Sequence, residues 1–228
     1  MLYARETMYQ SSCGLILRAS VINEADKVLT LYSYKWGKIY AVAPGAKKIK
    51  AKFIGATEPV TETDFMFYFT SNTSRPKVTG AKILNSFPSL IKDWRRHFVA
   101  QYCAEVCDRL TPLQSANPEK YDLLLRSWKL LETADNPWRI YIAYTLRFLK
   151  LSGYNFLEYI KKEDSYMPKD EAEIIRHLAT FSGDDIDKNL AIEQAMEETL
   201  MKKIDNFMAY YLHQNLSSKK MWQKAIYA

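Results

Sequence analysis

Residues 63–69 read Thr-Asp-Phe-Met-Phe-Tyr-Phe, and polar and apolar side chains alternate along this stretch. Residues 29–32, Leu-Thr-Leu-Tyr, alternate in the same way. Successive side chains of a strand point to opposite faces, so a period of two predicts a β-strand with one buried face. These two stretches decide the fold of the first part of the chain.

Around them lie further runs rich in Val, Ile, Thr, Tyr and Phe, which turn residues separate. The predicted strands are residues 12–21, 27–34, 38–43, 60–71 and 77–84. Five short strands within about 75 residues are too few for a sandwich but suit a compact barrel, with the OB-fold as the leading candidate.

After Pro88 the apolar residues recur at helical spacing as far as the C-terminus. The predicted helices are residues 89–110, 118–131, 136–153 and 189–215, and residues 161–187 form a loose connection or a surface helix. The sequence therefore predicts an α+β chain of two domains. An OB-fold barrel occupies residues 1–84, and an all-α helical domain occupies residues 85–228.

Composition excludes several classes of protein. Apolar residues make up 48% of the chain and charged residues 25%, which is typical of a globular protein. No apolar run reaches the roughly 18 residues of a membrane-spanning helix. Residues 1–10 mix Arg5 and Glu6 with tyrosines, unlike a signal peptide. We predict a cytoplasmic protein that does not bind a membrane.

The three cysteines are an odd number, which does not suit a disulfide framework. Cys103 and Cys107 lie one helical turn apart, which would supply half of a metal site. The three histidines do not complete a tetrahedral metal site with these two cysteines. We therefore predict that Cys103 and Cys107 are buried thiols.

Charge is distributed unevenly along the chain. Residues 1–83 hold 12 Lys and Arg against 6 Asp and Glu, whereas the remaining residues hold 20 against 20. The formal charge of +6 therefore belongs to the predicted barrel. Such an asymmetry indicates a polyanionic partner.

The most basic segment lies between the second and fourth predicted strands. It contains six lysines within eighteen residues and no acidic residue: Lys35, Lys38, Lys47, Lys48, Lys50 and Lys52. Lysines neutralise phosphates, and the neighbouring rings of Trp36, Tyr40 and Phe53 suit stacking on unpaired bases. The alternatives are that the lysines only solvate a loop and that Trp36 and Tyr40 belong to the barrel core.

The motifs of common enzymes are missing. The seven glycines form no GxxxxGK[ST], GxGxxG or GxSxG motif. The acidic residues Asp184, Asp185 and Asp187 follow Ser182-Gly183 and suit a helix cap or turn better than a nuclease metal site. We predict that the protein is not an enzyme.

Several short motifs resemble, in their order along the chain, the N-terminal domain of the bacterial RecO family of recombination mediators. The motifs are Gly14-Leu15-Ile16-Leu17-Arg18, Asn23-Glu24-Ala25-Asp26-Lys27, Gly37-Lys38, Gly45-Ala46-Lys47-Lys48 and Phe53-Ile54-Gly55. The resemblance continues through Pro59-Val60-Thr61, Ser86-Phe87-Pro88 and Asp108-Arg109-Leu110-Thr111-Pro112 to Gly153-Tyr154.

The resemblance implies an OB-fold followed by a helical domain, with a function in DNA repair and recombination. It implies binding to single-stranded and double-stranded DNA, annealing of complementary strands, and recombinase loading onto coated strands. The implied partners are RecR and the acidic C-terminal tail of the single-stranded DNA-binding protein, and the implied location is the bacterial nucleoid. The rival hypothesis is a protein–protein adaptor whose helical domain binds an acidic partner tail.

The family's basic element falls on Gly45-Ala46-Lys47-Lys48, preceded by Pro44, where many members have a further basic residue. Lysine keeps phosphate binding but lacks the bidentate geometry of arginine. The predicted DNA-binding residues are Lys47, Lys48, Lys50, Lys52, Lys35, Lys38, Arg18, Trp36 and Tyr40.

Two features of the predicted helical domain bear on ligands. Many family members have a four-cysteine zinc site after the motif that ends here in Gly153-Tyr154, but residues 155–160 contain no cysteine. We therefore predict no zinc and no cofactor. For the acidic tail, the candidates are Arg139, Arg147 and Lys150, which equally suit the solvent face of a helix.

Overall fold

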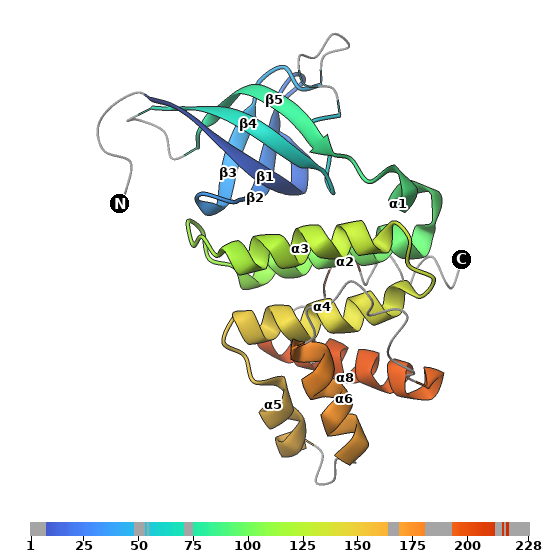
Figure 1. Cartoon of the computed structure of the whole chain (residues 1–228). Helices are drawn as coiled ribbons and strands as arrows, with labels where there is room; N and C mark the ends of the chain where they lie inside the picture. The colour runs from blue at the N-terminus through green and yellow to red at the C-terminus, as the bar shows by residue number, and fades with distance from the viewer. Residues whose placement is uncertain are drawn as a thin grey trace. The chain divides into compact units, whose positions relative to one another are not determined.

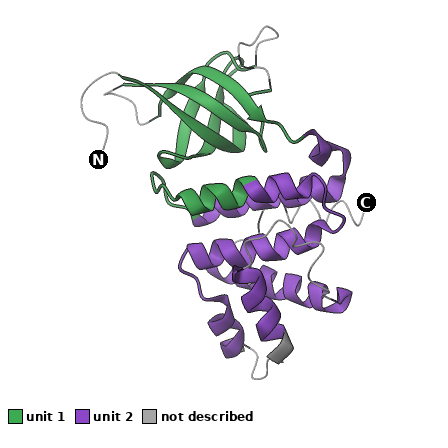
Figure 2. Cartoon of the chain, viewed as in Figure 1, with its two compact units in different colours: residues 1–87, 111–125 green, residues 88–110, 126–228 purple. Residues whose placement is uncertain are grey.

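The computed structural model describes residues 8–47, 53, 55–70, 75–163, 169–180, 193–212, 216 and 218. The chain divides into two compact units (Figure 2). Residues 1–87 with 111–125 form one, called here the barrel unit, and residues 88–110 with 126–228 form the other, the helical unit. The predicted division after residue 84 assigned residues 111–125 to the helices, whereas their contacts place them with the strands.

The barrel unit contains five strands, which lie close to the predicted ones (Figure 1). They are β1 (Met8–Val21), β2 (Lys27–Ser33), β3 (Gly37–Ala43), β4 (Glu62–Phe69) and β5 (Lys77–Asn85). The strand order β1-β2-β3-β5-β4 closes into a barrel, because β4 pairs with β1. A single parallel pair, Val42 with Lys77, joins β3 to β5. The predicted fold class, a five-stranded OB-type barrel followed by helices, is confirmed.

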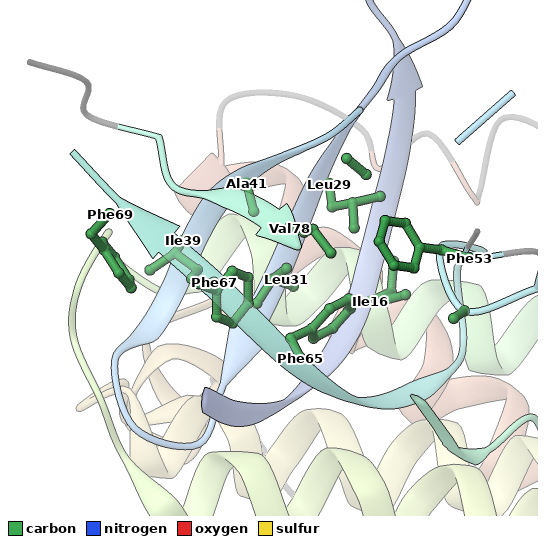
Figure 3. Packing of buried hydrophobic residues seen from close by; sticks show 12 residues of the cluster. Ile16, Leu29, Leu31, Ile39, Ala41, Phe53, Phe65, Phe67, Phe69 and Val78 are labelled. Atoms are coloured by element: carbon green, nitrogen blue, oxygen red, sulfur yellow. The ribbon is translucent and has the colours of Figure 1, made fainter. Parts of the chain in front are cut away.

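The alternating residues of β2, β3 and β4 fill the barrel (Figure 3). Phe65, Phe67 and Phe69 of β4 point inward together, and each is at most 8% exposed. Burial of such a side chain stabilises the fold by about 1.5–3 kcal/mol. The interior is completed by Ile16, Leu29, Leu31, Ile39, Ala41, Ala43, Phe53, Ala56 and Val78.

Strand β1 is the longest strand and pairs on both sides. Its first half pairs with β4 from Met8 to Leu15, and its second half pairs with β2 from Gly14 to Val21. The register with β2 shifts between Ile16 and Arg18. Such a bulge bends and twists a strand, which allows β1 to close the barrel.

Residues 111–125 cover part of the outer barrel surface. The hydroxyl of Tyr32 accepts a hydrogen bond from the backbone N of Asn117 (3.1 Å), and the backbone N of Gln114 donates to the carbonyl of Lys38 (2.9 Å). The hydroxyl of Tyr121 donates to Oε1 of Glu62 (3.1 Å). Tyr32 follows a residue that points into the core, so its own side chain points outward. It is nevertheless fully buried, because residues 111–125 cover it.

The helices have the following bounds: α1 (Pro88–Lys92), α2 (Trp94–Leu110), α3 (Pro118–Leu131), α4 (Pro137–Leu151), α5 (Phe156–Glu163), α6 (Lys169–Thr180) and α8 (Gln194–Leu212). The prediction of one continuous helix over residues 89–110 was wrong. It is interrupted at Asp93, whose carboxylate accepts a hydrogen bond from the backbone N of Arg95 (2.9 Å) and caps α2. Helix α4 begins as predicted, with Asn136 as its cap and Pro137 in its first turn.

Helices α2 and α4 and the end of α3 form the core of the helical unit. Trp128 is fully buried and donates from Nε1 to the carbonyl of Ala100 (3.1 Å). The hydroxyl of Tyr144 donates to the carbonyl of Cys103 (2.8 Å). Cys103 and Cys107 form no disulfide and are fully buried, which confirms the predicted buried thiols. Burial raises the pKa of Cys103 well above its ordinary value.

Candidate nucleic-acid interface

The basic segment after β3 begins at a turn that the β1–β2 connection anchors. The backbone N of Gly45 donates to Oδ1 of Asp26 (2.7 Å), and the backbone N of Lys47 donates to the carbonyl of Ala25 (3.0 Å). Asn23 in turn accepts hydrogen bonds from the backbone N of Ala25 and of Asp26. These bonds hold the exposed Lys47 beside the β1–β2 turn. The predicted residues Lys48, Lys50 and Lys52 lie outside the described residues.

Lys35 and Trp36 lie in the turn between β2 and β3. Lys35 is exposed, donates from Nζ to Oε1 of Gln10 (3.0 Å), and places Nζ 5.2 Å from the ring centroid of Trp36. Trp36 packs edge-on against Phe67 and Phe69, with ring centroids 5.6 and 5.2 Å away. Trp36 therefore packs as a core residue does. This agrees with the alternative interpretation from the sequence, in which its ring belongs to the barrel core.

Lys38 lies on the part of the barrel that residues 111–125 cover. It is 8% exposed, pairs with Tyr32 across the β2–β3 ladder, and forms a bridge with Leu113. A side chain as buried as that of Lys38 offers little surface to a phosphate. The other outward residues of the barrel are therefore the candidates for an interface.

Arg18 and Tyr40 come together on one outer face. Arg18 pairs with Thr30, and Thr30 pairs with Tyr40, so the three residues form one row across β1, β2 and β3. The guanidinium of Arg75 lies 5.7 Å from the ring centroid of Tyr40. Arg75 is not among the residues predicted from the sequence, because residues 72–76 were assigned only to a turn between two predicted strands. A second cation, Lys77, follows two residues later and is the signal that could have indicated Arg75.

Two carboxylates of the barrel unit, those of Glu58 and Glu62, make contacts within that unit. Glu58 forms an ion pair with Lys27, with 2.6 Å between Oε1 and Nζ. Glu62 accepts hydrogen bonds from Tyr121 and Asn85. The outer row with Arg18 has a second cation, Arg75, beside Tyr40, and clustered cations attract a polyanion.

The three candidate cations of α4 have different environments. Arg139 forms an ion pair with Glu197, with 2.6 Å between Nε and Oε1, and both side chains are largely buried. This pair joins α4 to α8. Arg147 is half-buried, whereas Lys150 is exposed.

Lys150 lines a cavity of about 750 Å³ within the helical unit. Arg176 and His177 of α6 lie on the same cavity, which has Glu173 as its acidic residue. The apolar part of the lining comes from Leu146, Phe156, Leu157, Ile175 and Ala179. Of the three predicted cations on α4, Lys150 is the one that lines this cavity.

Two kinds of feature are absent from the described residues. No group of three His, Cys, Asp or Glu side chains in this part of the chain has the arrangement that a metal ion needs. None of the described helices has the length and apolar character needed to cross a membrane. The acidic residues Asp184, Asp185 and Asp187 lie outside the described residues.

Comparison with known families agrees with the two-part architecture. Residues 8–87 match the family model for the recombination protein O N-terminal domain, and residues 91–156 match the model for its C-terminal domain. The chain belongs to the RecO family. The first match covers all five strands of the barrel, and the second covers α2, α3 and α4. The resemblance noted in the sequence is therefore confirmed.

Relatives named DNA repair protein RecO are similar over different lengths. The protein of Syntrophus aciditrophicus is 26% identical over 141 residues, which are 62% of this chain and 54% of the relative. The protein of Caldanaerobacter subterraneus is 24% identical over 200 residues, 87% of this chain and 78% of the relative. The protein of Listeria innocua is 22% identical over 235 aligned residues, 91% of each chain. The chain thus spans about half the length of the Syntrophus relative.

Proposed function

We propose that this RecO-family protein is a recombination mediator in DNA repair that binds single-stranded DNA through its barrel unit. It also binds double-stranded DNA, promotes the annealing of complementary strands and loads a recombinase onto coated single strands. The protein brings strands together and neutralises their charge, without a covalent step. The observation that carries the proposal is the outer row of Arg18, Thr30 and Tyr40 with Arg75 beside it.

The charges of this face suit a nucleic-acid backbone. Lys35 and Lys47 are exposed at the turns that border the barrel strands. Cations that contact phosphates release counterions, so binding weakens with salt and depends little on base sequence. The proposed interface therefore predicts a strongly salt-dependent affinity.

The test is a titration of the full chain into a fluorescent single-stranded oligonucleotide at several salt concentrations. The variant Arg18→Gln with Lys35→Gln and Lys47→Gln removes three charges of the proposed interface. We expect weaker binding of every sequence. We also expect the slope of log K against log salt to fall by about 2, since each single-strand phosphate contact contributes about 0.7.

A matched control removes three exposed lysines from the helical unit: Lys92→Gln, Lys129→Gln and Lys161→Gln. The net charge of the control equals that of the interface variant, so a general charge effect changes both chains alike. Equal affinities and slopes for the two variants would show that the interface lies elsewhere.

The proposal includes RecR and the acidic C-terminal tail of the single-stranded DNA-binding protein as partners. For the tail, the supporting observation is the cavity that combines apolar residues with Lys150, Arg176 and His177. Apolar lining with a few polar groups is typical of a peptide or ligand site, and cations at its edge suit carboxylates.

Fluorescence anisotropy with a peptide of that tail tests this site. Lys150→Glu with Arg176→Glu should weaken peptide binding about tenfold, because two attractive charges become repulsive. Lys92→Glu with Lys129→Glu makes the same charge change at exposed lysines that do not line the cavity. Full affinity in the first variant would exclude this cavity as the tail site.

The adaptor hypothesis rests on the same cavity, but it predicts a different result. An adaptor binds the tail peptide and leaves the oligonucleotide unbound even at low salt. A mediator binds both.

A further inference from the structure

A second row of outward residues crosses the barrel from β3 to β1 and joins cations to aromatic rings. Tyr68 pairs with Lys77 across β4 and β5, and Tyr9 pairs with Tyr68 across β1 and β4. Lys77 also pairs with Val42 of β3. Paired residues share one face of a sheet, so Val42, Lys77, Tyr68 and Tyr9 form a continuous row over four strands.

The neighbours of these residues show that the row faces outward. Phe67 and Phe69 on either side of Tyr68 point into the barrel core, and Val78 beside Lys77 does the same. Successive side chains of a strand alternate between faces, so Tyr68 and Lys77 lie on the outer surface. Lys77 is exposed, and Tyr9 is 64% exposed.

The rings of Tyr9 and Tyr68 support each other. Their centroids lie 4.9 Å apart, and their planes are inclined by 46°. Tyr68 is half-buried beneath the more exposed Tyr9. The contact limits the motion of Tyr9, so less conformational entropy is lost when a flat ligand stacks on its outer face.

The charges around the row are positive. Lys77 lies within it, and Arg75 precedes Lys77 by two residues and contacts Tyr40 of β3. Among the described residues, the next outward row along β4 contains Ser11, Met66 and Gly80, which carry no charge. The nearest outward carboxylate along β4 is Asp64, which faces Lys82.

We propose that Tyr9, supported by Tyr68, stacks on unpaired bases of single-stranded DNA while Lys77 and Arg75 contact the adjacent phosphates. Exposed aromatic rings interleaved with cations bind single strands because every base has a π-face, whereas the bases of a duplex are already stacked. The inference rests on the proposed DNA binding and assigns it a single-strand-specific subsite. This row thus favours single strands over duplexes.

The test compares two oligonucleotides of equal length: a run of thymidines, and a strand of abasic sites that keeps the phosphates. The wild-type chain should bind the thymidine strand more tightly than the abasic strand. Tyr9→Leu should weaken binding of the thymidine strand about tenfold and leave the abasic strand unaffected, since stacking by one ring contributes roughly that factor. Tyr9→Phe should bind both strands as the wild type does.

Two further variants separate stacking from other effects. Lys77→Gln should weaken binding of both strands and lower the salt slope by about 0.7. Tyr210→Leu serves as the matched control, because Tyr210 is 60% exposed in the helical unit, and it should change neither affinity. Unchanged abasic binding by Tyr9→Leu also shows that the variant barrel is folded.

The outcomes distinguish this inference from the proposed function. If Tyr9→Leu binds the thymidine strand as tightly as the wild type, or loses affinity for both strands alike, the stacking site is wrong. Equal affinity of the wild type for the two strands would also show that the stacking site is wrong. None of these results contradicts the proposed DNA binding by the barrel. If the wild-type chain binds neither strand at low salt, the proposed function itself fails.

Discussion

Gly37 begins β3 at the point where residues 111–125 cover the barrel, and its replacement by alanine should disrupt that packing. Its φ of 69° lies in the left-handed region, which L-residues with a Cβ adopt at a cost. A Cβ at this position would lie 2.6 Å from the backbone N of Ala116 and closer still to the carbonyl group of Ser115. Both obstacles are backbone atoms, so a rotamer change cannot relieve the clash.

The magnitude follows from two contributions. The left-handed conformation costs alanine about 1–2 kcal/mol relative to glycine. Displacing the backbone of residues 115–116 adds about 1–3 kcal/mol, as overpacking does in other cores. We therefore expect Gly37→Ala to lower the free energy of unfolding of the barrel unit by about 2–5 kcal/mol.

Gly153 provides the matched control. Its φ of 82° is also left-handed, but within the described part of the chain, leaving aside its own chain neighbours and the nearby backbone of α4, no atom lies within 4 Å of a Cβ at that position. Gly153→Ala should therefore cost only the conformational part, about 1–2 kcal/mol.

The assay is hydrogen exchange at increasing urea concentration, which reports the barrel amides separately from the helical ones. In Gly37→Ala, residues 111–125 should also exchange faster in native buffer, because the backbone N of Asn117 and of Gln114 lose their acceptors. Equal losses of stability in the two variants would refute the argument that the backbone of residues 115–116 blocks a side chain at position 37.

Two further predictions concern buried aromatic side chains. Trp128→Phe removes the bond from Nε1 to the carbonyl of Ala100 and leaves a cavity, so urea denaturation should show a loss of about 2–3 kcal/mol. Burial, and then the charge of Glu62, raise the pKa of Tyr121 above its ordinary value. Above pH ~10 the unfolded chain therefore binds fewer protons than the folded one, and stability should fall as pH rises. Denaturation at several alkaline pH values should show a smaller fall for Tyr121→Phe.

The strands could be predicted from the sequence because their signals are local. Alternation along residues 63–69 reflects one buried face, and the structure places Phe65, Phe67 and Phe69 in the barrel interior. The onset of helices after Phe87 was equally visible, and Pro118 and Pro137 open helices as predicted.

Contacts between distant parts of the chain explain what the sequence could not show. Lys38 is predicted to be exposed in a basic segment, yet residues 111–125 cover it from more than 70 residues away. The pairing of Tyr9 with Tyr68 likewise depends on the register of β1 and β4, which no local pattern reveals. Both outcomes depend on the closure of the barrel rather than on the composition of one segment.

Hydrogen exchange of the full chain with and without a single-stranded oligonucleotide at low salt tests the central claim most directly. If the barrel unit is the DNA-binding part, bound oligonucleotide should slow the exchange of amides within residues 8–47 and 62–85, including the turns that hold Lys35 and Lys47. Protection confined to residues 126–212, or no protection at saturating oligonucleotide, would contradict it.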